Sequence, residues 1–227
     1  VVPIYLKHMF ADDPVFRDVK IAVSLYDDAF PGELDAGFRA KVEHEGVQDE
    51  NLKILDNSSY QNLMRFVMDY ADGIVLAVED TPVDEAVADI AKALDRFGDT
   101  GTRVYVVVQA ACERTEGACM LIERLRQACE LRRLTWCGGV IACTGSGIAA
   151  LRHSPRMGLL RRPFSEATDK LVGAVRMGCS VEHAQLLGGG NASSVDTDGM
   201  VRARPAVPAL IWRAIIKRLG AHAQSNI

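Results

Sequence analysis

Three short apolar runs constrain the fold of this chain more than any other feature of its sequence. Residues 20–26 (KIAVSLY), 73–78 (GIVLAV) and 103–108 (RVYVVV) are rich in Val and Ile and are continuous rather than alternating. This pattern is typical of parallel strands that are covered by helices on both faces. Residues 138–143 (GGVIAC) predict a fourth strand, and residues 52–55 (LKIL) predict a weaker fifth. The sequence therefore predicts a parallel sheet of five strands.

Amphipathic helical patterns separate these strands. Apolar residues recur at helical spacing in residues 33–44, 60–70, 83–97 and 120–131, and residues 165–177 form a further candidate helix. Alternation of strands and helices predicts a doubly wound α/β fold with helices on both faces of the sheet. Right-handed crossovers leave few arrangements, and five strands at this spacing predict the flavodoxin-like order 2-1-3-4-5.

The predicted sheet occupies residues 19–187 and leaves a segment outside it at each end. Residues 1–18 contain an apolar run, and we expect an arm or an additional strand there. Residues 188–227 begin with a stretch rich in Gly, Ser, Asp and Pro, which predicts a loop. A basic helix at residues 209–221 follows, and we expect it to pack on the domain through Trp212.

Composition and charge exclude several classes of protein. The 227 residues are 48% hydrophobic and have a formal net charge of −4, which argues against a disordered chain and against a nucleic-acid partner. No apolar run reaches the roughly 18–20 residues that cross a bilayer, so no membrane partner is expected. The six cysteines form no CxxC pair and match no zinc or iron–sulfur spacing, and no signal peptide is recognised. We expect a cytoplasmic protein with reduced cysteines.

Acidic residues follow two of the predicted strands at the edge where doubly wound sheets bind ligands. Asp27 and Asp28 follow the first strand, and Asp80 follows the strand at residues 73–78. Clustered carboxylates suit a Mg²⁺ site and are similar to those of receiver domains. The Lys that receiver domains carry after the fifth strand is absent, however. An acidic surface turn is the favoured interpretation, with a metal-dependent or receiver-like role as an alternative.

From residue 71 onward the chain resembles flavodoxin-like NAD(P)H-dependent FMN oxidoreductases of anaerobic bacteria. The motifs that carry the resemblance lie in residues 71–77 (ADGIVLA), 103–118 (RVYVVVQAACERTEGA), 122–148, 155–175 and 208–227. They include a Trp-x-Gly-Gly sequence before the last predicted strand and a Gly-rich loop after it. The first 70 residues match only in the order of their strands and helices.

The resemblance implies an FMN cofactor at the carboxyl edge of the sheet. The flavin would take a hydride from NAD(P)H and pass electrons to a small-molecule acceptor, with no protein acid or base required. Such reductases are commonly homodimers, so a homodimer is a further expectation. The residues expected to hold FMN are Ser24, Tyr26, Glu79, Asp80, Thr81, Gln109, Ala110, Ala111, Cys112, Thr144, Gly145, Ser146 and Gly147.

The loop after the first strand departs from this family. The family binds the FMN phosphate on a loop rich in Gly, Ser and Thr, whereas residues 24–28 read Ser-Leu-Tyr-Asp-Asp. Carboxylates there would repel a phosphate and replace the backbone donors that bind it. Two hypotheses therefore stay open: an FMN-dependent reductase, and a flavodoxin-like module without flavin that serves protein–protein interaction or dimerisation.

Overall fold

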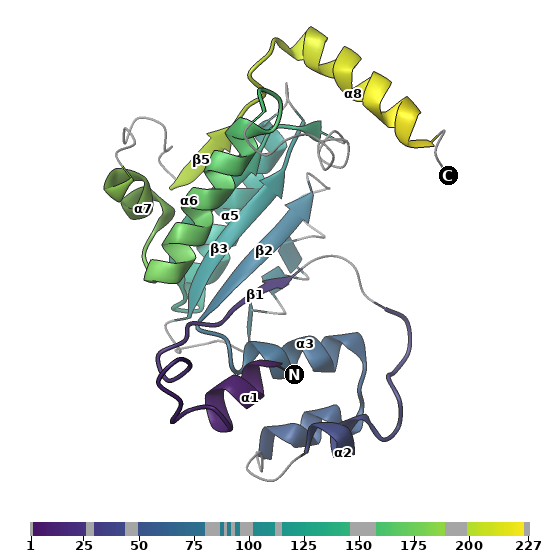
Figure 1. Cartoon of the computed structure of the whole chain (residues 1–227), viewed down its shortest axis with the longest axis vertical. Helices are drawn as coiled ribbons and strands as arrows, with labels where there is room; N and C mark the ends of the chain where they lie inside the picture. Colours follow the sequence, from purple (N-terminus) through teal and green to yellow (C-terminus); the bar gives the residue numbers. More distant parts are fainter. Residues whose placement is uncertain are drawn as a thin grey trace.

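The computed structural model describes residues 2–25, 30–43, 50–79, 87–88, 90–91, 94–95, 102–111, 115–145, 158–188 and 199–224. The strands are β1 (Ala22–Leu25), β2 (Gly73–Glu79), β3 (Arg103–Gln109), β4 (Thr135–Ala142) and β5 (Met200–Ala203). The helices are α1 (Val2–His8), α2 (Phe38–Val42), the 3-10 helix η1 (Glu50–Asp56), α3 (Tyr60–Met68), α5 (Glu116–Leu131), α6 (Arg162–Met177), α7 (Val181–Leu187) and α8 (Ala209–Gln224). Figure 1 shows their arrangement.

The five strands form one sheet in which every neighbouring pair is parallel. This confirms the α/β class and the five-stranded parallel sheet. The observed strand order is β1-β2-β3-β4-β5, so the predicted order 2-1-3-4-5 is not observed. Two segments account for the difference: the candidate strand at residues 52–55 is not a strand, and an unpredicted strand joins the sheet beyond β4.

Residues 52–55 belong to η1 because of the spacing of their leucines. Leu52 and Leu55 are both buried, against Phe66 of α3, Val42 of α2 and Ile4 of α1. Residues three apart lie on the same side of a 3-10 helix, whereas in a strand they point to opposite faces. The small core under α1, α2 and α3 therefore selects the helical turn. The N-terminal segment that was expected to be an arm or a strand contributes α1 to this core.

The fifth strand comes from the segment that was expected to be a loop. Met200 and Val201 of β5 are buried, and Met200 pairs with Gly139 of β4. Two glycines make room for the neighbouring strands, since a side chain at Gly138 would overlap Gly199 and one at Gly139 would overlap the backbone of Val106. The strand is short and follows a Gly- and Ser-rich stretch, which is why its pattern was missed.

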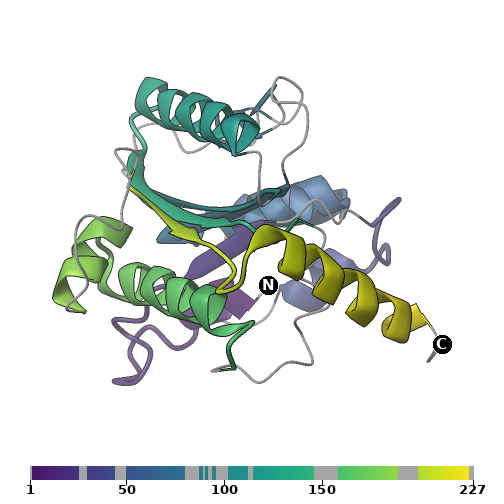
Figure 2. The ribbon, with the colours of Figure 1, turned by 90° about the horizontal axis from the view of Figure 1, so that it is seen from above.

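Helices cover both faces of the sheet, as Figure 2 shows. On one face α5 packs on the buried residues Ile74, Leu76, Val104, Val106, Val108 and Ile141, which point to it from three strands. On the other face α6 and α7 pack on Tyr105, Cys137, Val140, Ala142, Val201 and Ala203. The core is therefore split by the sheet into two apolar layers.

The α5 and α6 connections leave the sheet in different directions. Chain order advances the same way across the sheet from β3 to β4 and from β4 to β5, but α5 and α6 lie on opposite faces. The two connections therefore have opposite hands, and one of them departs from the right-handed rule. The helix that follows β3 and the helix that follows β4 thus lie on opposite faces, an arrangement that marks the usual ligand-binding position of a doubly wound sheet.

Candidate functional site

The structure describes part of the predicted FMN site. Tyr26, Asp80, Thr81, Cys112, Ser146 and Gly147 lie outside the described residues. Ser24, Glu79, Gln109, Ala110, Ala111, Thr144 and Gly145 lie within them. Most of these end or follow β2, β3 and β4, so the sheet brings them to one edge, as the prediction required.

Ser24 lies apart from this group. It pairs with Val75 of β2, which pairs with Tyr105 of β3, four residues before Gln109. At about 3.3 Å per residue, Ser24 lies ~13 Å along the strands from the level of Gln109. The described end of β1 therefore stops short of the level at which β3 ends, and Ser24 lies apart from Gln109.

The ends of β3 and β4 are bridged by the chain's own hydrogen bonds. The Gln109 side-chain amide donates to the Gly145 carbonyl at 2.9 Å, and the Gly145 N–H donates to the Ala110 carbonyl at 2.9 Å. Gly145 has a φ of 56°, a conformation that favours glycine. Ala110 and Thr144 are buried, so neither presents a surface to a ligand in this structure.

Trp212 of α8 covers the same edge. Its indole N–H donates to the Thr144 carbonyl at 3.3 Å, its ring centroid lies 6.0 Å from that of Phe164, and its side chain is 2% exposed. The expected packing of Trp212 on the domain is thus observed. Its position beside Thr144 was not predicted, because no local pattern in the sequence relates α8 to the end of β4.

A second candidate site lies at the amino edge, where the strands of the sheet begin. Its pocket has a volume of about 20 Å³, room for one water molecule, between α6 and the start of β1 and β2. It is lined by Lys20, Ile21, Ala22, Asp72, Gly73, Arg103, Tyr105, Val175 and Gly178. No motif in the sequence predicted a pocket at this edge.

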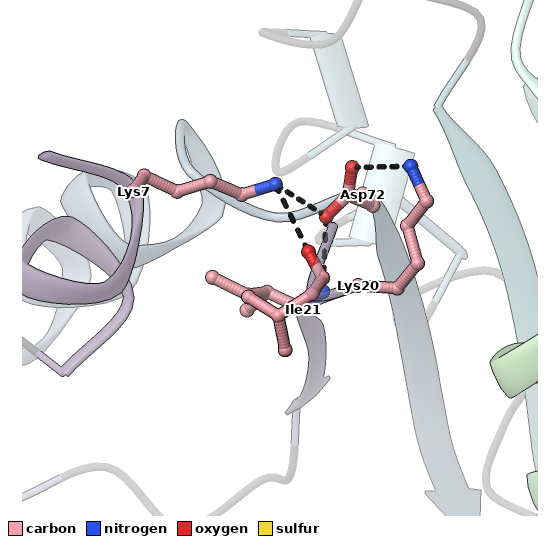
Figure 3. A network of polar contacts seen from close by, with 5 residues as sticks. Lys7, Lys20, Ile21 and Asp72 are labelled. Carbon is pink, nitrogen blue, oxygen red and sulfur yellow. Dashed lines mark hydrogen bonds and ion pairs between the residues drawn. The ribbon is translucent and has the colours of Figure 1, made fainter. Parts of the chain in front are cut away.

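Asp72 organises the charges beside the pocket, as Figure 3 shows. Its carboxylate accepts hydrogen bonds from Lys7 Nζ and the Ile21 N–H, each at 2.9 Å, and lies 3.6 Å from Lys20 Nζ. Partial burial acts to raise the pKa of Asp72, but the Ile21 bond and the two ammonium groups outweigh burial and lower it. The network ties α1 to the start of β1 and β2.

Burial keeps two titratable groups of the core, the Tyr105 hydroxyl and the Cys143 thiol, in their neutral forms. Burial raises the pKa of Tyr105, whose hydroxyl donates to the carbonyls of Cys179 and Ala174. Burial likewise raises the pKa of the thiol of Cys143, the residue that directly follows β4. Neither group is poised for acid–base or nucleophilic chemistry at neutral pH.

Neither a metal-binding cluster nor a membrane-spanning helix occurs among the described residues. These residues contain no group of three or more His, Cys, Asp or Glu side chains that could hold a metal ion. The acids Asp27, Asp28 and Asp80 lie outside the described ranges. No helix within the described ranges combines the length and the apolar character needed to span a bilayer.

Comparison with known proteins identifies no relative. No family model matches the chain, and neither the curated proteins nor the solved structures contain a match. The flavodoxin-like resemblance therefore stays a resemblance of sequence motifs, and no family membership is assigned.

Proposed function

We propose that this protein is a flavin-free α/β module that acts by binding another protein chain. One observation carries the proposal: the ends of β3 and β4, where doubly wound sheets bind their ligands, are bridged and partly covered by the protein's own groups. Gln109 bonds to Gly145 between the two strand ends, and Trp212 is buried beside Thr144.

A flavin that bound against the Thr144 end of β4 would have to displace the buried side chain of Trp212. Removing a buried Trp side chain from its packing costs about 3–5 kcal/mol, which the cofactor would have to supply from its own contacts. The phosphate cannot readily offset that cost, because Asp27 and Asp28 follow β1 in the sequence where family members have small polar residues. Both considerations support a module without flavin.

A second candidate is the FMN-dependent NAD(P)H oxidoreductase with a small-molecule electron acceptor. The observation in its favour is the order of β1 to β4, which equals the flavodoxin-like order 2-1-3-4-5 after loss of strand 2. For either function we propose a cytoplasmic location, because no disulfide joins the described cysteines, which are Cys119, Cys129, Cys137, Cys143 and Cys179.

Titration with FMN separates the two functions. The wild-type protein and the Trp212→Phe variant are titrated with FMN by calorimetry and by absorbance between about 350 and 500 nm, where bound flavin shifts its spectrum. We expect no binding by the wild type at millimolar FMN. Micromolar binding with a shifted flavin spectrum would overturn the flavin-free proposal and support the reductase. Circular dichroism checks that the variant is folded.

A further inference from the structure

We propose that the pocket at the amino edge is a binding site for a small anion, which Lys20 and Arg103 hold between them. The pocket lies between α6 and the start of β1 and β2 and has a volume of about 20 Å³. Lys20 precedes β1 and Arg103 begins β3, so the two cations reach the pocket from different strands. The inference does not depend on whether the protein binds flavin, because the FMN site was predicted where the strands end.

The guanidinium of Arg103 has no charged partner among the described residues. Arg103 is half-buried, and no carboxylate or hydrogen-bond acceptor within the described ranges pairs with its side chain. The guanidinium lies against Gly178, since a methyl group at Gly178 would contact Arg103 Cζ at 3.5 Å and Nη1 at 3.6 Å. Removing a cation from water is costly unless an anion compensates for its charge. An anion in the pocket would supply that compensation.

The charges around the pocket leave a positive surplus. Of the described residues that line it, Asp72 alone carries a carboxylate. Figure 3 shows that this carboxylate is already in contact with two cations, Lys7 Nζ at 2.9 Å and Lys20 Nζ at 3.6 Å. With Arg103, three positive charges therefore face one negative charge. The C-terminal end of α6 borders the pocket and adds a partial negative charge of about 0.5, which does not cancel the surplus.

Apolar groups form much of the wall of the pocket. They belong to Ile21, Ala22, Val175 and the ring of Tyr105. Tyr105 is 1% exposed, and its hydroxyl donates to the carbonyls of Ala174 and Cys179. Water screens charges less beside apolar groups than at an open surface. An anion should therefore interact more strongly with the two cations in this pocket than with Lys or Arg side chains elsewhere on the surface.

The size of the pocket restricts the anion. Its volume accommodates one water molecule, and a chloride ion is of similar size. A whole phosphate group is too large, whereas one oxygen of a carboxylate can enter from outside. The shared chemistry is a single negatively charged atom, and chloride and a carboxylate are its two sources.

Chlorine NMR of the full chain in solution tests the site, because exchange with a bound ion broadens the chloride resonance. We expect saturable broadening with the wild-type protein. Lys20→Gln and Arg103→Gln are each expected to weaken chloride binding about tenfold, because each removes one charged donor. Gly73→Ala adds a methyl group 3.4 Å from the Arg103 carbonyl and 3.5 Å from the Tyr105 ring. It is expected to abolish the broadening, because it fills the pocket and leaves both cations in place.

Two variants serve as matched controls. Arg162→Gln removes one positive charge at the start of α6, where Arg162 pairs with Glu166. Gly173→Ala adds a methyl group to α6 at a position where nothing lies within 4 Å. Both are expected to broaden the resonance as the wild type does. Circular dichroism checks that each variant is folded, and Lys20→Gln changes a side chain that is 58% exposed, so the test does not depend on the buried positions alone.

Addition of acetate distinguishes the two sources of the anion. Acetate that displaces chloride and narrows the resonance assigns the pocket to carboxylates as well, whereas acetate without effect assigns it to chloride. Absence of saturable broadening with the wild type would overturn the inference. Equal broadening in the wild type, Lys20→Gln and Gly73→Ala would also overturn it, because the chloride would then bind elsewhere.

Discussion

Different interactions hold the structure together at the carboxyl edge and at the amino edge of the sheet. At the carboxyl edge, Gln109, Gly145 and Trp212 are held by neutral hydrogen bonds and by apolar packing. At the amino edge, the charges of Lys7, Lys20 and Asp72 hold α1 against the sheet. Packing and neutral bonds respond little to pH or salt, whereas partly exposed ion pairs respond to both. The contribution of the amino edge to stability should therefore depend on pH and salt, whereas that of the carboxyl edge should depend on side-chain packing.

The largest expected effect is at Trp212. Replacing it with Ala removes a buried indole and its bond to Thr144, and should lower the free energy of unfolding by about 3–5 kcal/mol. Urea denaturation followed by circular dichroism measures the change. Trp136→Ala is the matched control, because Trp136 is only half-buried and should cost less. Equal losses in the two variants would show that the carboxyl edge is not closed by packing of Trp212.

The next effect is at Asp72. Asp72→Asn removes the ion pairs to Lys7 and Lys20, and should lower the free energy of unfolding by about 1–2 kcal/mol at neutral pH, allowing for partial exposure. Because the pKa of Asp72 is lowered in the folded protein, its contribution is complete above its unfolded pKa of about 3.9 and disappears as pH falls through its folded pKa. Urea denaturation at several pH values should show the wild type and variant converging in acid.

Two controls complete the measurement at the amino edge. Trp212→Ala should keep the pH dependence of the wild type, since the contacts of Trp212 with Thr144 and Phe164 involve no titrating group. Asp56→Asn, at an exposed carboxylate that pairs with Arg39, should change stability little. A constant difference between wild type and Asp72→Asn down to acid pH would contradict the role assigned to the Asp72 charge.

The smallest effect is expected at Gln109. Gln109→Ala removes the hydrogen bond to the Gly145 carbonyl and should cost about 0.5–1.5 kcal/mol, with no change on adding salt. Thermal unfolding at low and high ionic strength measures both. Gln127→Ala, on the exposed side of α5, is the control and should be nearly neutral. A salt-dependent loss at Gln109 would break the distinction between the two edges.

Two long apolar strands and the amphipathic helix predicted at residues 120–131 were predictable from the sequence, whereas the helix predicted at 33–44 is observed only as Phe38–Val42 and the one predicted at 83–97 lies largely outside the described residues. Strand 73–78 is observed as Gly73–Glu79 and strand 103–108 as Arg103–Gln109, because continuous Val and Ile runs have few alternatives to a buried strand. Helix α5 extends the predicted residues 120–131 by one turn, to Glu116. In these elements a local pattern and the final packing agree.

The short elements were not predictable, because four residues carry too little pattern to choose a structure. Residues 52–55 contain leucines that suit a strand or a turn, and burial against Ile4 and Phe66 decided for the turn. Met200–Ala203 became a strand because Gly138 lets Gly199, the residue before β5, approach β4 closely. In each case the deciding contact is distant in sequence.

The candidate site, like the fold, has one part that the sequence predicts and another that depends on tertiary contacts. The sequence by itself determined that Gln109 and Thr144 would follow neighbouring strands at one edge, since parallel strands bring their carboxyl ends together. Only the tertiary structure decided that this edge is closed, because Trp212 reaches Thr144 from 68 residues away and neither segment specifies the other locally. The tertiary structure also decided the strand order. The pairing of β1 with β2 and of β5 with β4 depends on contacts between distant segments, which the periodicity of the sequence does not predict.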